Sequence, residues 1–348
     1  MNTYRKHLLK SSSTIREALE RLNILALDAI IFIIDSDSKL IGSLTDGDVR
    51  RGLLYGFGID NLVTEIIQSN PRFIRKGNYE LAKVLDFRDN NFRIIPILDK
   101  ESRIVNVINF RETKSYLPVD AVIMAGGRGE RLRPLTDNTP KPLLKIGDKS
   151  IIEHNLNRLA LFGIDDFWIS LGYLGEQIEA WGGDGREKNI SIQYITEDIP
   201  LGTIGAVAKI DNLVHDSLLV TNSDVLTNID YEHFYLDFIR QDADFSVVTI
   251  PYSVDIPYAV LETNNGHVLN FREKPTYTYY SNGGIYLMKK KVIKLIPKNT
   301  QYHATQLMED LLKAGKKVIS YPLAGYWLDI GRHEDFKKAN KDINQIIF

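Results

Sequence analysis

The sequence predicts an α/β protein with an N-terminal α+β pair of repeats and a larger C-terminal domain built on a doubly wound, mostly parallel sheet. Two observations predict this fold. The segments 31–44 and 95–108 align without gaps at an offset of 64 residues. From residue 120 onward, short apolar strands alternate with longer helical patterns. Such alternation indicates a parallel sheet with helices on both faces.

Each repeat combines a helix with a β-hairpin. The helical patterns follow the polar caps Thr14 and Asn78, which also differ by 64 positions, and the hairpins turn at Asp35 and Asp99. Two copies of one unit therefore fill the first part of the chain, although chance similarity between amphipathic stretches is the alternative. A boundary follows at 115–118, and we expect domains at residues 1–58, 59–117 and 119–348.

The C-terminal part contains the elements of the predicted sheet. We expect its strands at 121–124, 166–170, 191–194, 218–220 and 245–249. We expect its helices at 150–161, 176–181, 204–209 and 231–240. Ligands of open α/β sheets bind beyond the carboxyl ends of the strands. Residues that directly follow a strand are therefore the first candidates for a site.

Composition excludes several classes of protein. Hydrophobic residues make up 44% and charged residues 25% of the 348-residue chain, which excludes a disordered or fibrous protein. The net charge of −2 argues against binding nucleic acid through bulk charge. Because cysteine is absent, disulfides and thiolate chemistry are excluded. The start lacks the apolar core of a signal peptide and no apolar run approaches membrane-spanning length, so we expect a cytoplasmic protein without a membrane partner.

The segment after the first predicted strand has the composition of a polyphosphate-binding loop. Its glycines are Gly126, Gly127 and Gly129. They allow backbone N–H groups to approach phosphate oxygens. Its cations are Arg128, Arg131, Arg133 and Lys141, the last between two prolines. Neither the P-loop spacing nor the dinucleotide fingerprint fits, and an ordinary turn is the alternative interpretation.

This segment resembles the signature of sugar-1-phosphate nucleotidyltransferases, and the resemblance extends over residues 119–348. It implies a Rossmann-like domain that joins a nucleoside triphosphate to a sugar 1-phosphate and releases pyrophosphate. The implied catalytic contacts come from Arg131, Lys141 and Lys274. The implied nucleotide contacts come from Ala125, Gly126, Gly127, Gly129, Glu197, Gly202 and Thr203. The implied sugar contacts come from Gly172, Glu273, Asn282 and Gly283.

Two carboxylates are candidates for a metal site. Asp224 follows a buried strand, and Asp329 lies between an aromatic stretch and a glycine. Two aspartates that converge on a polyphosphate suit Mg²⁺, and the equivalent aspartates of the resembled family hold the catalytic magnesium. Taken alone, Asp224 is equally explained as a helix cap or turn residue. The chain departs from the family at Ala259, where the usual residue is glycine, and this affects the expected shape of the sugar pocket.

The loop 196–206 looks more like that of guanylyltransferases than that of thymidylyl- or uridylyltransferases. Guanine presents two adjacent donors, and the Glu197 carboxylate accepts both; the alternative is that Glu197 faces solvent or pairs with a basic side chain. We expect GTP with glucosamine 1-phosphate, or with mannose or heptose 1-phosphate. The whole chain resembles CBS-bearing guanylyltransferases of the legionaminic acid type. An enzyme that uses another base and a non-catalytic regulatory subunit are the alternatives.

The first 118 residues look like a tandem pair of CBS domains. Thr45 and Asp48 resemble that family's ribose-binding Thr-x-x-Asp, whereas Asn109 and Glu112 occupy the corresponding positions of the second repeat. We expect a regulatory adenine nucleotide in the first repeat and a homo-oligomer; a pair that serves only for packing is the alternative. The seven histidines show no close metal-ligand spacing.

Overall fold

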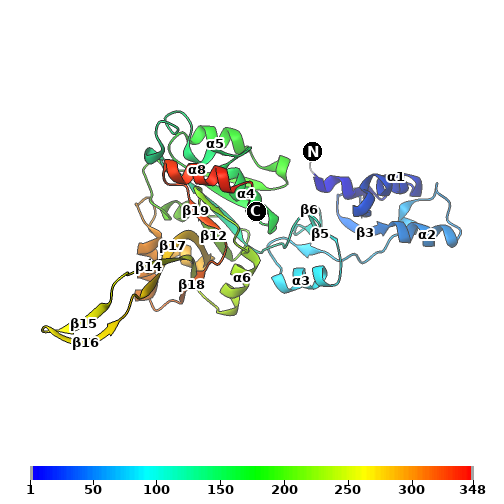
Figure 1. Ribbon diagram of the computed structural model, residues 1–348. Helices are drawn as coiled ribbons and strands as arrows, with labels where there is room; N and C mark the ends of the chain where they lie inside the picture. Colours follow the sequence, from blue (N-terminus) through cyan, green and yellow to red (C-terminus); the bar gives the residue numbers. More distant parts are fainter. Residues whose placement is uncertain (1–2, 346–348) are drawn as a thin grey trace.

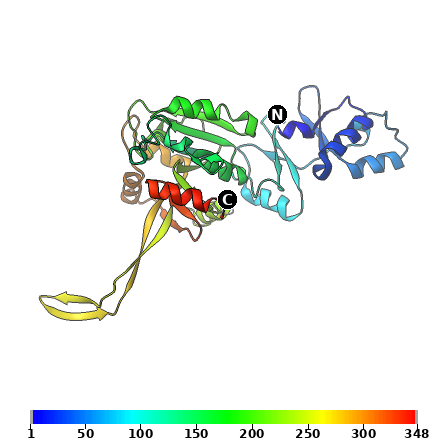
Figure 2. The same cartoon turned by 45° about the horizontal axis from the view of Figure 1, so that its top comes forward.

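The computed structural model describes residues 3–345, so residues 1–2 and 346–348 of the predicted first and third domains lie outside it. Figure 1 shows two small modules in blue and cyan beside a larger one in green to red. A long two-stranded arm in yellow projects from the larger module, and the view in Figure 2 shows the same projection. Within residues 3–345, no helix is long and apolar enough to cross a membrane.

The two small modules repeat one arrangement of a three-stranded sheet. The first contains β1 (Leu8–Lys10), α1 (Ile15–Leu25), β2 (Ile30–Ile34), β3 (Leu40–Thr45) and α2 (Asp46–Leu54). The second contains β4 (Ile74–Arg75), α3 (Leu81–Asp89), β5 (Ile94–Leu98) and β6 (Ile104–Asn109). In both, the first strand is parallel and the third antiparallel to the middle strand. The paired hairpins begin 64 residues apart, which confirms the predicted repeat.

The two helix starts differ more than the hairpins do. Thr14 caps α1 and forms a capping box with Glu17, as the sequence predicts for this position. The predicted cap at Asn78 is wrong, because α3 begins at Leu81 after Glu80, which makes no capping bond through its side chain. The backbone N–H of Asn78 instead donates to Arg75 at 3.0 Å. A turn therefore takes the place of the expected cap.

The large module is built on a seven-stranded sheet with the order β11-β10-β7-β12-β17-β14-β18. Its strands are β7 (Asp120–Ala125), β10 (Asp166–Leu171), β11 (Ser191–Thr196), β12 (Ser217–Asn222), β14 (Phe245–Asp255), β17 (Thr276–Lys289) and β18 (Val318–Pro322). Only β17 runs antiparallel to its neighbours within this sheet. The predicted mostly parallel sheet is therefore confirmed. The predicted strand 245–249 continues to Asp255, because its second half forms the arm.

Helices cover both faces of this sheet. They are α4 (Ile151–Leu161), α5 (Gly175–Gly182), α6 (Tyr231–Arg240), α7 (Ala304–Lys313) and α8 (His333–Asp342). Along β7, Ala121 and Ile123 join the cluster that includes α4 and α6, whereas Val122 joins the cluster that includes α7. Successive strand residues point to opposite faces, so the two clusters lie on the two sides of the sheet and the domain is doubly wound.

Short elements complete the large module. They are the pairs β8 (Lys145–Ile146) with β9 (Lys149–Ser150), β13 (Val225–Thr227) with β19 (Trp327–Asp329), and β15 (Val260–Asn264) with β16 (His267–Arg272). The α-helix predicted at 204–209 is instead a 3₁₀ helix, η7 (Gly205–Lys209). Its N–H groups donate to carbonyls three residues earlier, as Ile210 does to Val207. The segment is only five residues long, a length at which 3₁₀ turns are common.

The second small module packs directly on the large one. Its Ile74, Val84 and Ile108 belong to the same hydrophobic cluster as residues of α4 and β7. Across the same boundary, Arg88 donates to both carboxylate oxygens of Glu232 at 2.9 and 3.2 Å. A bidentate pair of this kind fixes orientation as well as distance. The second module and the large one are therefore held together by apolar packing and by directed ion pairs.

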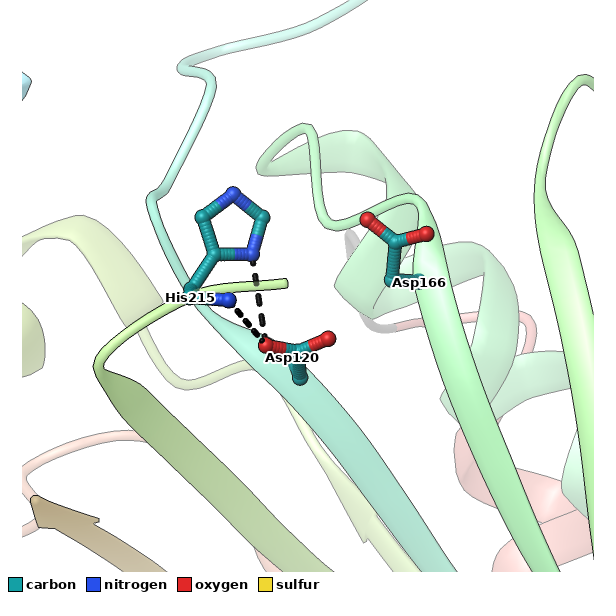
Figure 3. Close-up of side chains that lie close together, drawn as sticks. All are labelled: Asp120, Asp166 and His215. Carbon is teal, nitrogen blue, oxygen red and sulfur yellow. Dashed lines mark hydrogen bonds and ion pairs between the residues drawn. The ribbon is translucent and has the colours of Figure 1, made fainter. Parts of the chain in front are cut away.

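A buried group of charges lies where the second module meets the amino ends of the strands (Figure 3). His215 donates its backbone N–H to Asp120 at 2.7 Å, and Asp166 lies close by on β10. Lys76 of the second module reaches Asp166 at 2.9 Å. Burial, with a contribution from the nearby charge of Asp165, raises the pKa of Asp166 to about 6, although Lys76 opposes this shift.

The raised pKa of Asp166 predicts a pH-dependent contribution to stability. The folded protein binds this proton more tightly than the unfolded chain, so the stabilisation is complete below the ordinary pKa of aspartate and is lost as the pH rises through 6. Asp166→Asn cannot ionise, so we expect the variant to gain stability relative to wild type between pH 5 and pH 7.5. Urea unfolding at the two pH values measures this difference. The exposed control Asp148→Asn should show no such trend, and a constant difference for Asp166→Asn would contradict the prediction.

Candidate active site

A cleft of about 510 Å³ lies at the carboxyl ends of the central strands. It is lined by segments that follow β7, β11 and β12, together with Gly331 after β19. Of the predicted residues, it brings together Gly126, Gly127, Gly129, Arg131, Lys141, Glu197, Gly202, Thr203 and Asp224. This is the edge of an open α/β sheet at which ligands bind. Ala125 ends β7 beneath the loop and is buried.

The glycine loop is shaped by its contacts with Lys141 and Glu197. Gly129 has a φ of 63°, and a Cβ at this position would lie 3.0 Å from the Cβ of Lys141. A Cβ at Gly126 would lie 2.7 Å from Oε1 of Glu197. A Cβ at Gly127 would meet no described atom within 4 Å. Two of the glycines therefore permit close packing inside the protein, and the third borders open space where a ligand fits.

Lys141 is the central cation of the cleft. It begins the short 3₁₀ helix η5 (Lys141–Leu143) directly after Pro140, and it is only 8% exposed. Its ammonium forms an ion pair with the carboxylate of Asp224, which follows β12. The side chain of Lys141 is thus held in one orientation at the floor of the cleft. A buried ammonium of this kind needs an anionic partner, either this carboxylate or a phosphate.

Asp224 and Asp329 lie next to each other on a short antiparallel ladder. Val225 pairs with Asp329 in the register of β13 and β19, and Ile330 donates its N–H to the carbonyl of Asp224 at 3.0 Å. Burial raises the pKa of Asp329, and the negative charge of Asp224 adds to this effect, whereas Lys141 and Arg131 oppose it. Among the described residues, Oδ1 of Asp329 is buried without a hydrogen-bond partner.

The two aspartates have the donor set of a hard cation. Carboxylate oxygens are the ligands that Mg²⁺ takes in proteins, and Oδ1 of Asp329 is free to accept such an ion within the described structure. The residues therefore fit the predicted magnesium. The sequence names both aspartates as candidates, and the pairing of β13 with β19 shows how two positions so far apart in the chain meet.

Glu197 presents its carboxylate to the cleft in a fixed orientation. Oε1 accepts from Ser170 at 2.5 Å, and Oε2 accepts from the backbone N–H of Leu201 at 2.9 Å. Each carboxylate oxygen can accept a further hydrogen bond. The alternative that Glu197 faces bulk solvent does not describe this structure, because Glu197 lines the cleft beside Gly126.

The predicted sugar-binding residues do not all lie together. Asn282 accepts from the N–H of Gly284 at 2.9 Å, and a Cβ at Gly284 would lie 2.6 Å from the side chain of Asn222, which lines the cleft. Residues 282–284 therefore border the cleft, and they belong to the strand β17 rather than to the predicted turn. Gly172 packs against the glycine loop, since a Cβ there would lie 2.4 Å from the carbonyl oxygen of Gly126. A role of Gly172 in sugar binding stays a prediction.

Glu273 and Lys274 lie outside the cleft of their own chain. Both are exposed and lie between β16 and β17 on the projecting arm (Figures 1 and 2). Lys274 lies before the start of β17 at Thr276, and β17 then runs for roughly 20 Å before it reaches Asn282. The expectation that one chain gathers Lys141, Lys274 and Asp224 in a single site is therefore corrected. The cause is the straight continuation of β14 and β17 away from the body of the molecule.

A second cavity, of about 310 Å³, lies between the two small modules. Thr45 and Asp48 line it together with Gln68 and Arg72. Asp48 accepts hydrogen bonds from Thr45 and, at 3.1 Å, from Gln68. Burial opposes ionisation of Asp48, but hydrogen bonds from Thr45, Gln68 and Arg51 lower its pKa overall. Asp48 is therefore a buried anion at the edge of a cavity.

Sequence spacing does not reveal the cluster of Asp120, Asp166 and His215. Each offers one ligand atom, and these atoms lie within 4.8 Å of one another. The three residues are far apart in the sequence and meet only because β7, β10 and the segment before β12 lie side by side. Lys76 already places an ammonium 2.9 Å from Asp166. We interpret the cluster as part of the contact between modules.

Comparison with known families identifies the chain. The nucleotidyl transferase family matches residues 120–346, and the CBS domain family matches residues 7–55. The first match covers more than half of the sequence. The chain therefore belongs to the nucleotidyl transferase family, with a CBS domain at its N-terminal side.

Individual relatives agree with this assignment. The chain is 34% identical to a mannose-1-phosphate guanylyltransferase of Mycobacterium tuberculosis over 232 residues, which cover 65% of this chain and 64% of that protein. It is 30% identical to a D-glycero-α-D-manno-heptose 1-phosphate guanylyltransferase of Aneurinibacillus thermoaerophilus, over 66% of this chain and 100% of that protein. A Bacillus anthracis structure assigned provisionally as a glucose-1-phosphate thymidylyltransferase superposes with a TM-score of 0.53 at 27% identity, over 66% of this chain and 97% of that one.

The two loop glycines give a test of the cleft geometry. In Gly126→Ala the added methyl group would have to displace the hydrogen-bonded carboxylate of Glu197. We expect this overpacking to lower the free energy of unfolding by about 1–3 kcal/mol. Gly127→Ala is the matched control and should stay within about 0.5 kcal/mol of wild type, because its methyl group meets open space. Chemical denaturation measures both, and equal losses would contradict the observed packing.

Proposed function

We propose that this protein transfers the nucleotidyl group of GTP to a sugar 1-phosphate and releases pyrophosphate. The observation that carries the proposal is the convergence of the glycine loop, Arg131, Lys141 and Asp224 on one cleft. Membership in the nucleotidyl transferase family supports the reaction class. The names of the two guanylyltransferase relatives support GTP as the donor.

The chemistry requires placement and charge neutralisation rather than proton transfer. A phosphate oxygen of the sugar 1-phosphate attacks the α-phosphorus of the triphosphate. The bond from the α-phosphorus to the bridging oxygen breaks, and pyrophosphate leaves with the electron pair. Because the attacking oxygen is already anionic, no general base is needed. The protein must hold two repelling polyanions in line.

The cleft residues have charges suited to this task. Backbone N–H groups of the glycine loop and Arg131 would bind the β- and γ-phosphates. Lys141 would neutralise charge at the α-phosphate, and its pairing with Asp224 sets its position before any substrate arrives. Such preorganised charge acts without reorganisation during the reaction. Lys274 would bind the phosphate of the sugar substrate.

Asp224 and Asp329 would hold Mg²⁺ through their carboxylate oxygens. The buried, unpartnered Oδ1 of Asp329 among the described residues supports this assignment. When bound, Mg²⁺ neutralises phosphate charge and orients the reacting groups. The positive charge of Arg131 opposes the rise in the pKa of Asp329 and so favours its ionised carboxylate.

We assign recognition of the nucleotide base and recognition of the sugar to two different sides of the cleft. Glu197 would accept hydrogen bonds from N1–H and the exocyclic amine of guanine, because each of its oxygens retains acceptor capacity. Gly202 and Thr203 lie on the same side of the cleft. Residues 282–284 of β17 would meet the sugar hydroxyls. Glucosamine 1-phosphate is our first candidate, with mannose and heptose 1-phosphates after it.

Pyrophosphate release tests the proposed reaction. With Mg²⁺, we assay GTP, UTP, CTP, ATP and dTTP against several sugar 1-phosphates and expect one strong combination, with GTP. Lys141→Ala should lower that rate by about 10²–10³-fold, as is typical for loss of a positioned electrostatic stabiliser. The exposed Lys145→Ala is the matched control and should retain the wild-type rate. Activity with another triphosphate would remove Glu197 as the guanine reader, and activity with none would favour a regulatory subunit.

We further propose that residues 1–58 and 59–117 form a CBS pair that binds an adenine nucleotide in the cavity beside Thr45 and Asp48. A hydroxyl and a carboxylate at this cavity suit the two hydroxyls of ribose. The buried, ionised Asp48 supports the assignment. The match of the CBS domain family to residues 7–55 supports it independently.

Calorimetry with AMP on the full chain tests this site. AMP lacks the β- and γ-phosphates for which the glycine loop is proposed, so its heat reports on the small modules. We expect binding to wild type and to the exposed control Asp46→Asn, and no binding to Asp48→Asn. Binding that survives in Asp48→Asn would place the nucleotide elsewhere. Absence of heat with wild type would leave the pair with a packing role alone.

A further inference from the structure

The arm of the large module is an extension of its central sheet. It comprises residues 250–282, in which β14 and β17 pair without interruption from Ile250 with Ser281 to Asp255 with Thr276. The hairpin of β15 and β16 continues beyond them. Figures 1 and 2 both show this arm standing clear of the rest of the molecule. The paired part alone extends on the order of 20 Å from the body.

The arm exposes far more apolar surface than its length warrants. Of the 22 large hydrophobic residues that are exposed among the described residues, nine lie within these 33 positions. They are Tyr252, Val254, Tyr258, Leu261, Val268, Leu269, Phe271, Tyr279 and Tyr280. A two-stranded ribbon is at best marginally stable alone in water. A contiguous exposed apolar patch on a soluble protein marks an interaction surface.

The two faces of the paired strands differ in polarity. Residues opposite each other on paired strands share a face, so Tyr252 and Tyr279 lie on one face with Val254. The other face carries Ser253 bonded to Thr278 at 3.2 Å and Thr276 bonded to Asp255 at 2.6 Å, with Tyr280 opposite Pro251 near the body. One face is thus mainly apolar and the other mainly polar, as in a sheet with one buried and one solvated face. The aromatic face is therefore the one suited to contact with another protein surface.

We propose that the occupant is a second copy of this chain, and that exchange of arms brings Glu273 and Lys274 of one copy to the cleft of the other. In a twofold dimer the same patch serves on both copies, so two aromatic faces cover each other without a separate receptor site. The aromatic face of a 33-residue arm supplies a large part of the roughly 20–30 residues per side of a standard stable interface. The place of Lys274 at the cleft rests on the proposed function, which needs a cation for the sugar phosphate.

The geometry of a single chain leaves this cation too far away. Asn282 lies at the rim of its own cleft, and Lys274 precedes the start of β17 at Thr276, so the length of strand between them is roughly 20 Å. A straight ribbon cannot return to its own cleft without breaking the pairs from Ile250 to Asp255. An arm that extends past the twofold axis instead reaches the neighbouring subunit. Each cleft is then completed by the other chain.

Sedimentation of the full chain tests the dimer without any assay of activity. We expect a species of twice the 39.7 kDa chain mass at micromolar concentration. Tyr279→Lys, on the aromatic face, should yield monomers. Thr278→Lys is the matched control, since it adds the same charge one residue away on the polar face, and it should remain dimeric. A monomeric wild type, or equal dissociation of both variants, would overturn the proposal.

Mixing two inactive variants tests whether the cleft is shared. Asp224→Ala lacks a cleft carboxylate and Lys274→Ala lacks the arm cation, so each alone should be inactive. After chain exchange, half of the molecules are mixed dimers with one intact site, and about a quarter of the wild-type rate per chain should return. If wild type is active and the two variants exchange chains but recover no activity, the arm does not complete the partner's cleft. An inactive wild type that is dimeric would instead refute the proposed function and leave the arm-mediated dimer standing.

Discussion

The ion pair of Lys141 with Asp224 is the contact on which the rest of the cleft depends. It joins the short helix after Pro140 to the end of β12. The aliphatic part of Lys141 supports Gly129, whose left-handed backbone closes the loop. Asp224 in turn is tied through Ile330 to the strand that carries Asp329. Removal of either partner would leave a buried charge uncompensated, so loop, strand and metal ligands keep their positions together.

The same sheet carries a second group of charges at its opposite end. Asp120 begins β7 and Ala125 ends it, so the contact with the second module and the glycine loop are the two ends of one strand, separated by roughly 17 Å. The end at Asp120 is closed by Lys76 and by apolar packing, whereas the end at Ala125 opens into the cleft. The strand therefore links the contact with the small modules to the glycine loop of the cleft.

Patterns among residues close together in the sequence predicted much of this structure, but they did not predict contacts between residues that are far apart in the chain. The repeat, the parallel strands and the loop after β7 follow from offsets, alternation and turn residues that lie close together in the chain. Two local predictions also needed correction, since α3 begins at Leu81 rather than after Asn78, and the predicted helix at 204–209 is a 3₁₀ helix from Gly205. Gly172 remains a predicted sugar-binding residue, and its lack of a side chain permits close contact with Gly126, which lies 46 positions away.

By itself the sequence determined the fold class, the doubled small module and the residue types of a polyphosphate site, because these depend on short-range periodicity and on the conformational freedom of glycine. The tertiary structure alone decided which charges meet. It gathered Asp120 and Asp166 from two strands with His215 from the bend before β12, placed Asp329 beside Asp224, and carried Lys274 away from its own cleft. Alternation along a strand specifies which face a side chain takes, but neither where that strand leaves the body nor which surface covers it.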